Sequence, residues 1–180
     1  NPSGNVLRLN GSTEYINVGS SASLDKIFSQ GGGTAEAWIK PFSDGESNFG
    51  RIFDKSISTG GSNGWHFLVT GESNGACKLR FSHAFTSGGV YWDTTSTVIT
   101  INAWNHVAVV YDNSSPDNNV QYYVNGSAVD DTPNRSTPSG SAVDDSSQDL
   151  YIGNNASTER AFDGIIDEVR LYNRKLELAE

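Results

Sequence analysis

Short runs of β-branched and aromatic residues, separated by turn-forming residues, are the feature that most restricts the fold of this chain. About twelve such runs follow one another along the sequence, a spacing typical of β-sandwiches and jelly rolls. The clearest turn is Asn125-Gly126, which lies between two such runs and favours a tight β-hairpin. Helical periodicity is weak and confined to 22–28 and the residues from 176 on. The pattern predicts an all-β chain, folded as a two-sheet antiparallel β-sandwich.

Strand-like runs occur at both ends of the chain, and no linker separates two halves. We therefore expect residues 1–180 to form a single domain, since all-β domains of this length are common. Residues 130–147 are rich in Asp, Ser, Thr and Pro and predict a long surface loop, with solvated acids at Asp144 and Asp145. No apolar stretch approaches the roughly 18 residues of a membrane-spanning helix, so we expect no membrane insertion.

Charge and cysteine content exclude several classes of function. The formal net charge is −9 and no cluster of Lys and Arg occurs, whereas nucleic-acid binding needs a positive surface. We therefore expect no nucleic-acid partner. Cys77 is the only cysteine, so the chain forms no internal disulfide, and no zinc-binding pattern is present. We interpret Cys77 as a small, unreactive residue at the edge of a strand.

Six motifs occur in the order in which the laminin-G-like jelly-roll family of the concanavalin A-like superfamily carries them. They are L-N-G followed by Y-I-N-V at 9–18, E-A-W-I-K-P at 36–41, W-N-H-V-A-V-V-Y-D at 104–112, Y-V-N-G at 123–126, L-Y-I-G at 150–153 and F-D-G-I-I-D-E-V-R-L-Y-N-R-K-L at 162–176. The resemblance covers nearly the whole chain and implies a concanavalin A-like jelly roll. It does not determine function, because this architecture carries lectins, adhesion modules and enzymes alike.

The acids and histidines lack the spacing of known catalytic sites. Enzymes of this architecture that cleave β-glucans resemble one another in an E-x-D-x-x-E run along one strand, and the chain has no such run. The adjacent Asp167 and Glu168 point to opposite faces of a strand, so they cannot act together at ~5–5.5 Å as acid and nucleophile. The three histidines fit neither a zinc-binding H-E-x-x-H motif nor a Ser/His/Asp triad. We therefore predict a non-catalytic domain.

The resemblance also implies a structural calcium ion near the meeting point of the terminal strands. In the family the usual ligands are backbone carbonyls and an acid of the closing strand. Asp167 matches that acid, and Asn10 and Gly11 match the opening turn. Asn10 stands where family members often have Asp, which lowers the charge of the ligand set. The alternative is that Asp167 only pairs with a basic residue or caps a turn.

Carbohydrate binding is the function that we predict first. Sugars stack their C–H faces on aromatic rings, and their hydroxyls need amides or carboxylates nearby. The candidate ligand-binding residues are Tyr91, Trp92 and Asp93 on a strand, with Asn118 and Asn119 in a loop. Strand alternation sends either Tyr91 or Trp92 outward, and in the alternative arrangement Trp92 faces the core.

A second function fits the same residues. The chain could instead be a protein-recognition, structural or adhesion module on a cell surface or a phage particle. Under either function we expect an extracellular, cell-surface or virion-associated location. Binding of a glycan to the chain is the observation that separates the two.

Overall fold

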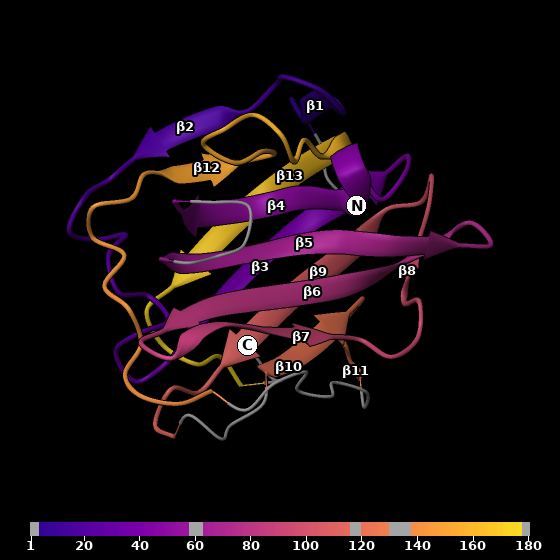
Figure 1. The fold of residues 1–180 in the computed structure, drawn as a ribbon. Helices are drawn as coiled ribbons and strands as arrows, with labels where there is room; N and C mark the ends of the chain where they lie inside the picture. The colour runs from indigo at the N-terminus through magenta and orange to yellow at the C-terminus, as the bar shows by residue number, and fades with distance from the viewer. Residues whose placement is uncertain (1–3, 58–62, 116–119, 130–137, 178–180) are drawn as a thin grey trace.

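Two antiparallel sheets pack face to face in the computed structural model, which describes residues 4–57, 63–115, 120–129 and 138–177. Figure 1 shows one sheet in front and the other behind it, with strands that cross obliquely. The predicted two-sheet antiparallel β-sandwich is therefore confirmed. No helix in the described part of the chain is long and apolar enough to cross a membrane.

The rear sheet, which we call sheet A, has six strands. In spatial order they are β1 (Leu7–Asn10), β13 (Asp163–Tyr172), β3 (Gly33–Pro41), β9 (Asn105–Tyr111), β10 (Val120–Val124) and β11 (Ser127–Val129). The front sheet, sheet B, has seven. They are β2 (Ile16–Gly19), β12 (Leu150–Ile152), β4 (Phe49–Ser56), β5 (Gly64–Ser73), β6 (Ala76–Phe85) and β7 (Gly88–Asp93), with β8 (Ile99–Thr100) paired to β6. A short 3-10 turn, η1 (Glu46–Asn48), precedes β4.

The two ends of the sequence meet in sheet A. The opening strand β1 pairs with the closing strand β13, and β13 pairs on its other side with β3. The predicted hairpin at Asn125-Gly126 joins β10 to β11, and both residues have positive φ, of 52° and 78°. Positive φ at both central positions is the requirement of the type I′ turn that Asn-Gly favours, so the hairpin prediction is confirmed.

Two predictions from the sequence need correction. The weak helical periodicity at 22–28 does not form a helix; the segment is a series of turns that buries Ile27 and Phe28 in the core. In the surface loop predicted at 130–147, of which 138–147 are described, Asp145 is buried and not solvated. Its carboxylate accepts hydrogen bonds from the Lys26 amide at 2.8 Å and the Trp65 indole at 3.1 Å. Both corrections reflect packing between distant segments, which local composition does not show.

The core lies between the sheets and is filled by the inward side of each strand. Trp65, Phe67 and Val69 alternate along β5, and aromatic rings of both sheets contact one another there. Cys77 on β6 is fully buried and pairs with Ile99 of β8, in agreement with its interpretation as a small strand residue. Burial raises the pKa of the Cys77 thiol to about 12, with Asp44 and Glu72 adding to the effect.

One hydrogen-bonded side chain connects the two sheets through this core. Tyr122 belongs to β10 of sheet A, and its hydroxyl reaches the backbone of sheet B. The hydroxyl accepts the amide proton of Phe81 at 2.6 Å and donates to the carbonyl of Trp92 at 2.7 Å. Phe81 and Trp92 are opposite one another on β6 and β7, so Tyr122 satisfies two groups of the same strand pair.

We expect Tyr122→Phe to lower the free energy of unfolding by about 1–3 kcal/mol, because it leaves a buried amide and a buried carbonyl without their partner. Urea denaturation measures this change, and hydrogen exchange of the Phe81 amide should become faster. The neighbouring Tyr123→Phe is the matched control and should change stability little. Equal stability of Tyr122→Phe and the wild type would contradict the role of this bond.

Candidate functional site

Polar side chains gather on the outer face of sheet B and are largely shielded from solvent. The strand register places Tyr151, Asp54, His66, Ser82 and Tyr91 in one row across β12, β4, β5, β6 and β7. The three central members are almost fully buried, and Tyr91 at the end of the row is 36% exposed. The outer face of a sandwich is usually solvated, so buried polar groups here cost free energy and mark a candidate site.

Two carboxylates on this face hold two guanidinium groups. Asp54 accepts a hydrogen bond from Nε of Arg51 at 2.8 Å. Asp93 accepts two from Arg80, at 2.5 Å from Nε and 2.8 Å from Nη2. Two parallel bonds fix the plane of the guanidinium group as well as its position. Arg80 is therefore a rigid feature of the face.

Arginines and aromatic rings alternate along the same face. The guanidinium carbon of Arg80 lies 4.2 Å from the ring centre of Tyr91 and 5.2 Å from that of Phe49. The guanidinium carbon of Arg160 lies 5.7 Å from the ring centre of Phe49 as well. We call Tyr91, Arg80, Phe49 and Arg160 the arginine–aromatic array. Such contacts contribute roughly 0.5–1 kcal/mol each at exposed positions and favour these orientations of the rings.

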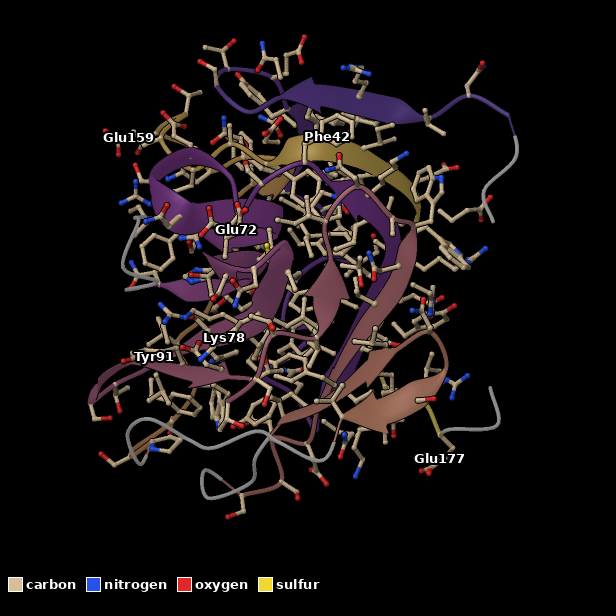
Figure 2. All side chains as sticks on the ribbon, turned by 90° about the vertical axis from the view of Figure 1, so that its right-hand side faces the viewer. Phe42, Glu72, Lys78, Tyr91, Glu159 and Glu177 are labelled. Carbon is tan, nitrogen blue, oxygen red and sulfur yellow. The ribbon has the colours of Figure 1, made fainter. Side chains whose placement is uncertain are left out.

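A polar hollow of ≈ 550 Å³ adjoins the array and shares Phe49 with it. Its lining residues offer carboxylates, amides and hydroxyls beside that one ring. They are Asp44, Asn48, Phe49, Thr70, Gly71, Glu72, Ser73 and Asn74. Figure 2 shows Glu72, Lys78 and Tyr91 along one side of the molecule, with Glu177 on the other. The array and the hollow together form a surface that can bind a hydroxylated ring.

Burial changes the ionisation of the polar row. It raises the pKa of Asp54 to about 6, an effect that Arg51 and hydrogen bonds from Ser56 partly offset. It also lowers the pKa of Arg51, and it lowers that of His66 well below its usual value, with the charges of Arg51 and Arg80 adding to the effect. His66 is therefore neutral at pH 7. Its buried Nδ1 has no hydrogen-bond partner among the described residues.

The structure changes the set of predicted ligand-binding residues. Tyr91 faces outward, but Trp92 is fully buried, 5.3 Å from the ring centre of Tyr111, so the prediction of Trp92 as a surface platform is wrong. The reason is the parity of β7, which sends Trp92 into the core. Asp93 is 5% exposed and positions Arg80 instead of facing solvent. Asn118 and Asn119 lie outside the described residues.

Sequence reasoning missed the other members of the array. Arg80 lies in an alternating run, K-L-R-F, whose parity shows that Arg80 faces away from the core. Its contact with Tyr91 depends on the pairing of β6 with β7, and Phe49 comes from the start of β4. Arg160 lies in the connection before β13, where no local signal marks it.

The residues predicted to hold calcium do not meet. Asn10 lies opposite Asp163 on β13, and Asp167 follows Asp163 by four positions, or roughly 13 Å along the strand. Gly11 also lies against Asp163: a Cβ atom added to it would be 2.8 Å from the Asp163 Cβ. Asn10, Gly11 and Asp167 therefore do not form one ligand set. Within the described residues, no group of three His, Cys, Asp or Glu side chains could hold a metal ion.

A family model described as the concanavalin A-like lectin/glucanases superfamily matches residues 10–180. The chain belongs to this superfamily. No curated protein sequence matches it significantly. Membership agrees with the two-sheet sandwich and with the order of the six sequence motifs.

Solved structures of three sugar-related proteins share the fold of this concanavalin A-like chain. The CBM40 module of an IT-sialidase from Ruminococcus gnavus, solved with α2,3-sialyllactose, has a TM-score of 0.68 at 14% identity, over 97% of this chain and 92% of that one. Domain 4 of an extracellular arabinanase from Geobacillus stearothermophilus, solved with arabinotriose, has a TM-score of 0.58 at 18% identity, over 97% of this chain and 73% of that one. A putative carbohydrate-binding protein from Bacteroides ovatus has a TM-score of 0.61 at 24% identity, over 96% of this chain and 46% of that one. At these identities the likeness shows the fold alone.

The raised pKa of Asp54 predicts how the free energy of unfolding depends on pH. Between about pH 4 and 6 the folded protein keeps its proton on Asp54 while the unfolded chain loses it, so the free energy of unfolding falls as pH rises. Asp54→Asn does not titrate. The wild-type unfolding free energy minus that of the variant should therefore decrease by about 2–3 kcal/mol from pH 4 to pH 7.

Urea denaturation at several pH values measures this difference. The unfolding free energy of the variant is subtracted because His66 and His83 also make stability depend on pH. Both have a lowered pKa, and their effect is opposite to that of Asp54. Each stays neutral in the folded protein, so stability is lost as pH falls below the ordinary histidine pKa of about 6.5. A wild-type-minus-variant difference that does not change with pH would contradict the raised pKa of Asp54.

Proposed function

We propose that this chain is a non-catalytic carbohydrate-binding module and that the glycan lies on the outer face of sheet B. The observation that carries this assignment is the exposed ring of Tyr91, locked by Arg80 beside a polar hollow. An aromatic ring offers a stacking surface, and the hollow offers hydrogen-bond partners for hydroxyls. A pocket that combines apolar surface with a few placed polar groups is typical of a small-ligand site.

Rigidity of the array favours binding. Asp93 fixes Arg80 on one side, and Arg80 in turn contacts both Tyr91 and Phe49. Rings that are already held in place lose little conformational freedom when a ligand binds, so more of the contact energy remains as affinity. The array extends over several residues, which suits an oligosaccharide better than a single small molecule.

The comparisons support the carbohydrate class without naming a sugar. Two of the proteins with this fold were solved with sialyllactose and with arabinotriose, and the superfamily is described by its lectins and glucanases. Asp54 and Asp93 on this face are each engaged with an arginine, which suits binding more than acid–base chemistry. We further propose an extracellular, cell-surface or virion-associated location, where such glycans occur.

Protein recognition is a second candidate, and one surface favours it. Val6, Tyr15, Ile16, Val18 and Val169 are exposed apolar residues on or next to β1, β2 and β13. Exposed apolar residues that cluster at one edge of a protein often mark an interaction surface. A partner protein would bind there and leave the arginine–aromatic array free.

We expect Tyr91→Ala to weaken glycan binding at least tenfold, or by about 1.4 kcal/mol, because the stacking ring is lost. Titration calorimetry with glucans, galactans and alginate-like acids measures the affinity. Tyr15→Ala is the matched control, since Tyr15 is also an exposed tyrosine but lies next to β2 at the opposite edge of sheet B. Equal binding by wild type and Tyr91→Ala would rule out this face, and binding of no glycan at all would favour protein recognition.

Calcium stabilisation stays a prediction. If the chain binds calcium, a hundredfold excess of the ion over its Kd raises the free energy of unfolding by about 2.7 kcal/mol, and a chelator lowers the melting temperature. Asp163→Asn and Asp167→Asn then show which end of β13 holds the ion, because only one of them should remove the effect of the chelator. Identical melting curves with calcium and with chelator would exclude a stabilising ion.

A further inference from the structure

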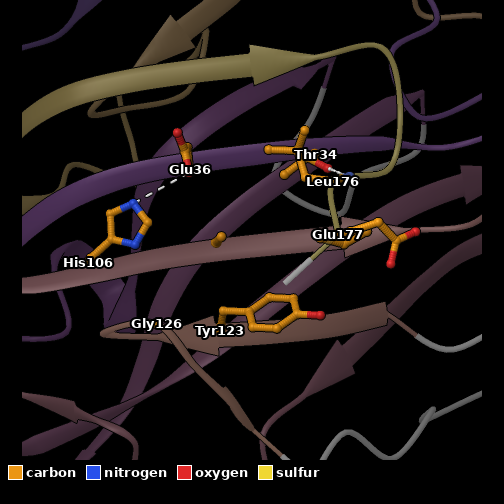
Figure 3. Close-up of a pocket in the computed structure, with 9 residues that line it drawn as sticks. Thr34, Glu36, His106, Tyr123, Gly126, Leu176 and Glu177 are labelled. Atoms are coloured by element: carbon orange, nitrogen blue, oxygen red, sulfur yellow. Dashed lines mark hydrogen bonds and ion pairs between the residues drawn. The ribbon is translucent and has the colours of Figure 1, made fainter. Parts of the chain in front are cut away.

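A second, smaller hollow opens on the outer face of sheet A, on the side of the sandwich away from the arginine–aromatic array. It has a volume of ≈ 150 Å³, and its principal lining residues are Glu36, His106, Ala108, Tyr123 and Leu176. Figure 3 shows Glu36 and His106 at one end, Leu176 at the other and the ring of Tyr123 along one side. Tyr91, Trp92 and Asp93, the predicted ligand-binding residues that the structure describes, do not line it.

The strand register explains why the surface is hollow here. Glu36, Ala108 and Tyr123 lie opposite one another in a row across β3, β9 and β10. Adjacent strands are about 4.8 Å apart, so the backbones that carry Glu36 and Tyr123 are about 10 Å apart. The methyl group of Ala108 is all that lies between them. A single small residue between two large ones therefore leaves a space wide enough for one ring.

The segment after β13 closes one end of the hollow. The amide of Leu176 donates to the Thr34 hydroxyl at 3.0 Å, and that hydroxyl donates to the carbonyl of Arg174 at 3.0 Å. These two bonds hold Leu176 over the outer face of sheet A. The hollow thus has an aromatic wall at Tyr123 and a polar end at Glu36, and Leu176 and Glu177 line its other end.

The carboxylate of Glu36, at the polar end, is surrounded by several hydrogen-bond donors at long distances. Its Oε1 accepts from Nη1 of Arg170 at 3.3 Å and from the Tyr172 hydroxyl at 3.2 Å, and its Oε2 lies 3.4 Å from Nε2 of His106. Each distance exceeds the 2.7–2.9 Å or so of a strong charge-assisted bond. A carboxylate has about four acceptor positions, so Glu36 can also accept hydrogen bonds from a ligand in the hollow.

We propose that this hollow binds one neutral sugar residue, stacked on Tyr123, with hydroxyls donating to Glu36 and exchanging hydrogen bonds with His106. Glu36 and Arg170 form an ion pair at the polar end, so their charges largely cancel there. Neither an anion nor a cation therefore gains much from this end of the hollow. A neutral ring with hydroxyls on its edge meets both conditions. The inference rests on the proposed carbohydrate function but concerns a site on the opposite face of the domain.

Two sites on opposite faces make the domain bivalent. A sugar residue held at Tyr123 and an oligosaccharide held at Tyr91 would belong to different glycan strands, because the sandwich separates them. Binding two epitopes at once raises the overall avidity without a new contact at either site. The domain would then link glycan strands to one another.

Ala108→Leu and Glu36→Gln test the second site, with Tyr91→Ala as the matched variant on the other face. The probes are methyl glycosides of glucose, galactose, mannose and arabinose, titrated singly by calorimetry and by amide chemical shifts. We expect the wild type to bind at least one of them, with shifts at His106, Ala108 and Tyr123. Leucine at 108 fills the hollow and should weaken binding at least tenfold, and Glu36→Gln should weaken it with unchanged melting temperature.

The variants separate the two proposals. If Tyr91→Ala abolishes binding of every sugar while Ala108→Leu and Glu36→Gln bind normally, the second site is wrong and the sheet B site stands. If monosaccharide binding depends on Ala108 and Glu36 but not on Tyr91, the second site stands whatever the outcome for sheet B. If no monosaccharide binds the wild type, or if its shifts map to Tyr91, the second site is overturned.

Discussion

The hydroxyl of Tyr122 ties the two sheets together inside the core by more than apolar contact. Hydrophobic packing has little direction, so it leaves two sheets able to slide over one another. A hydrogen bond from sheet A into the β6–β7 pair allows one alignment only. The residues next to Phe81 and Trp92 on β6 and β7 are Arg80, Tyr91 and Asp93. The arrangement of the outer face of sheet B therefore depends on a bond made on its inner face.

Ion pairing offsets the free-energy cost of burying charged groups on this outer face. Burying Arg51 or Asp54 alone would cost several kcal/mol, and each is tolerable because the other is within hydrogen-bond distance. Replacing both with apolar residues would often be neutral or stabilising for a protein, so the pair is poorly explained by stability alone. Arg80 and Asp93 form a second ion pair on the same face, which is less deeply buried. Polar burial at one place and a rigid exposed ring beside it are the combination expected of a recognition surface.

The sequence predicts the sandwich well because its signals are local. Alternation, Asn125-Gly126 and six ordered motifs each act within about fifteen residues. The sites depend on register, which is not local. Asp167 and Asp163 differ by four positions on one strand, and this decides which acid adjoins the Asn10-Gly11 turn. Tyr91 and Trp92 are adjacent, and only the parity of β7 puts one in solvent and the other in the core. Ala108 carries no sequence signal at all, because the hollow comes from its neighbours on other strands.

Cys77 gives the domain a property that goes beyond packing. Its thiol is buried in the core beside Ile99 of β8, and a pKa near 12 leaves almost no thiolate at neutral pH. Oxidants and alkylating reagents act on thiolates, so the folded domain behaves alike in reducing and oxidising surroundings. The same sulfur becomes reactive once local opening of β6 exposes it to solvent. The rate at which Cys77 is modified therefore measures local opening at the end of sheet B that carries the polar hollow. The measurement needs no added label.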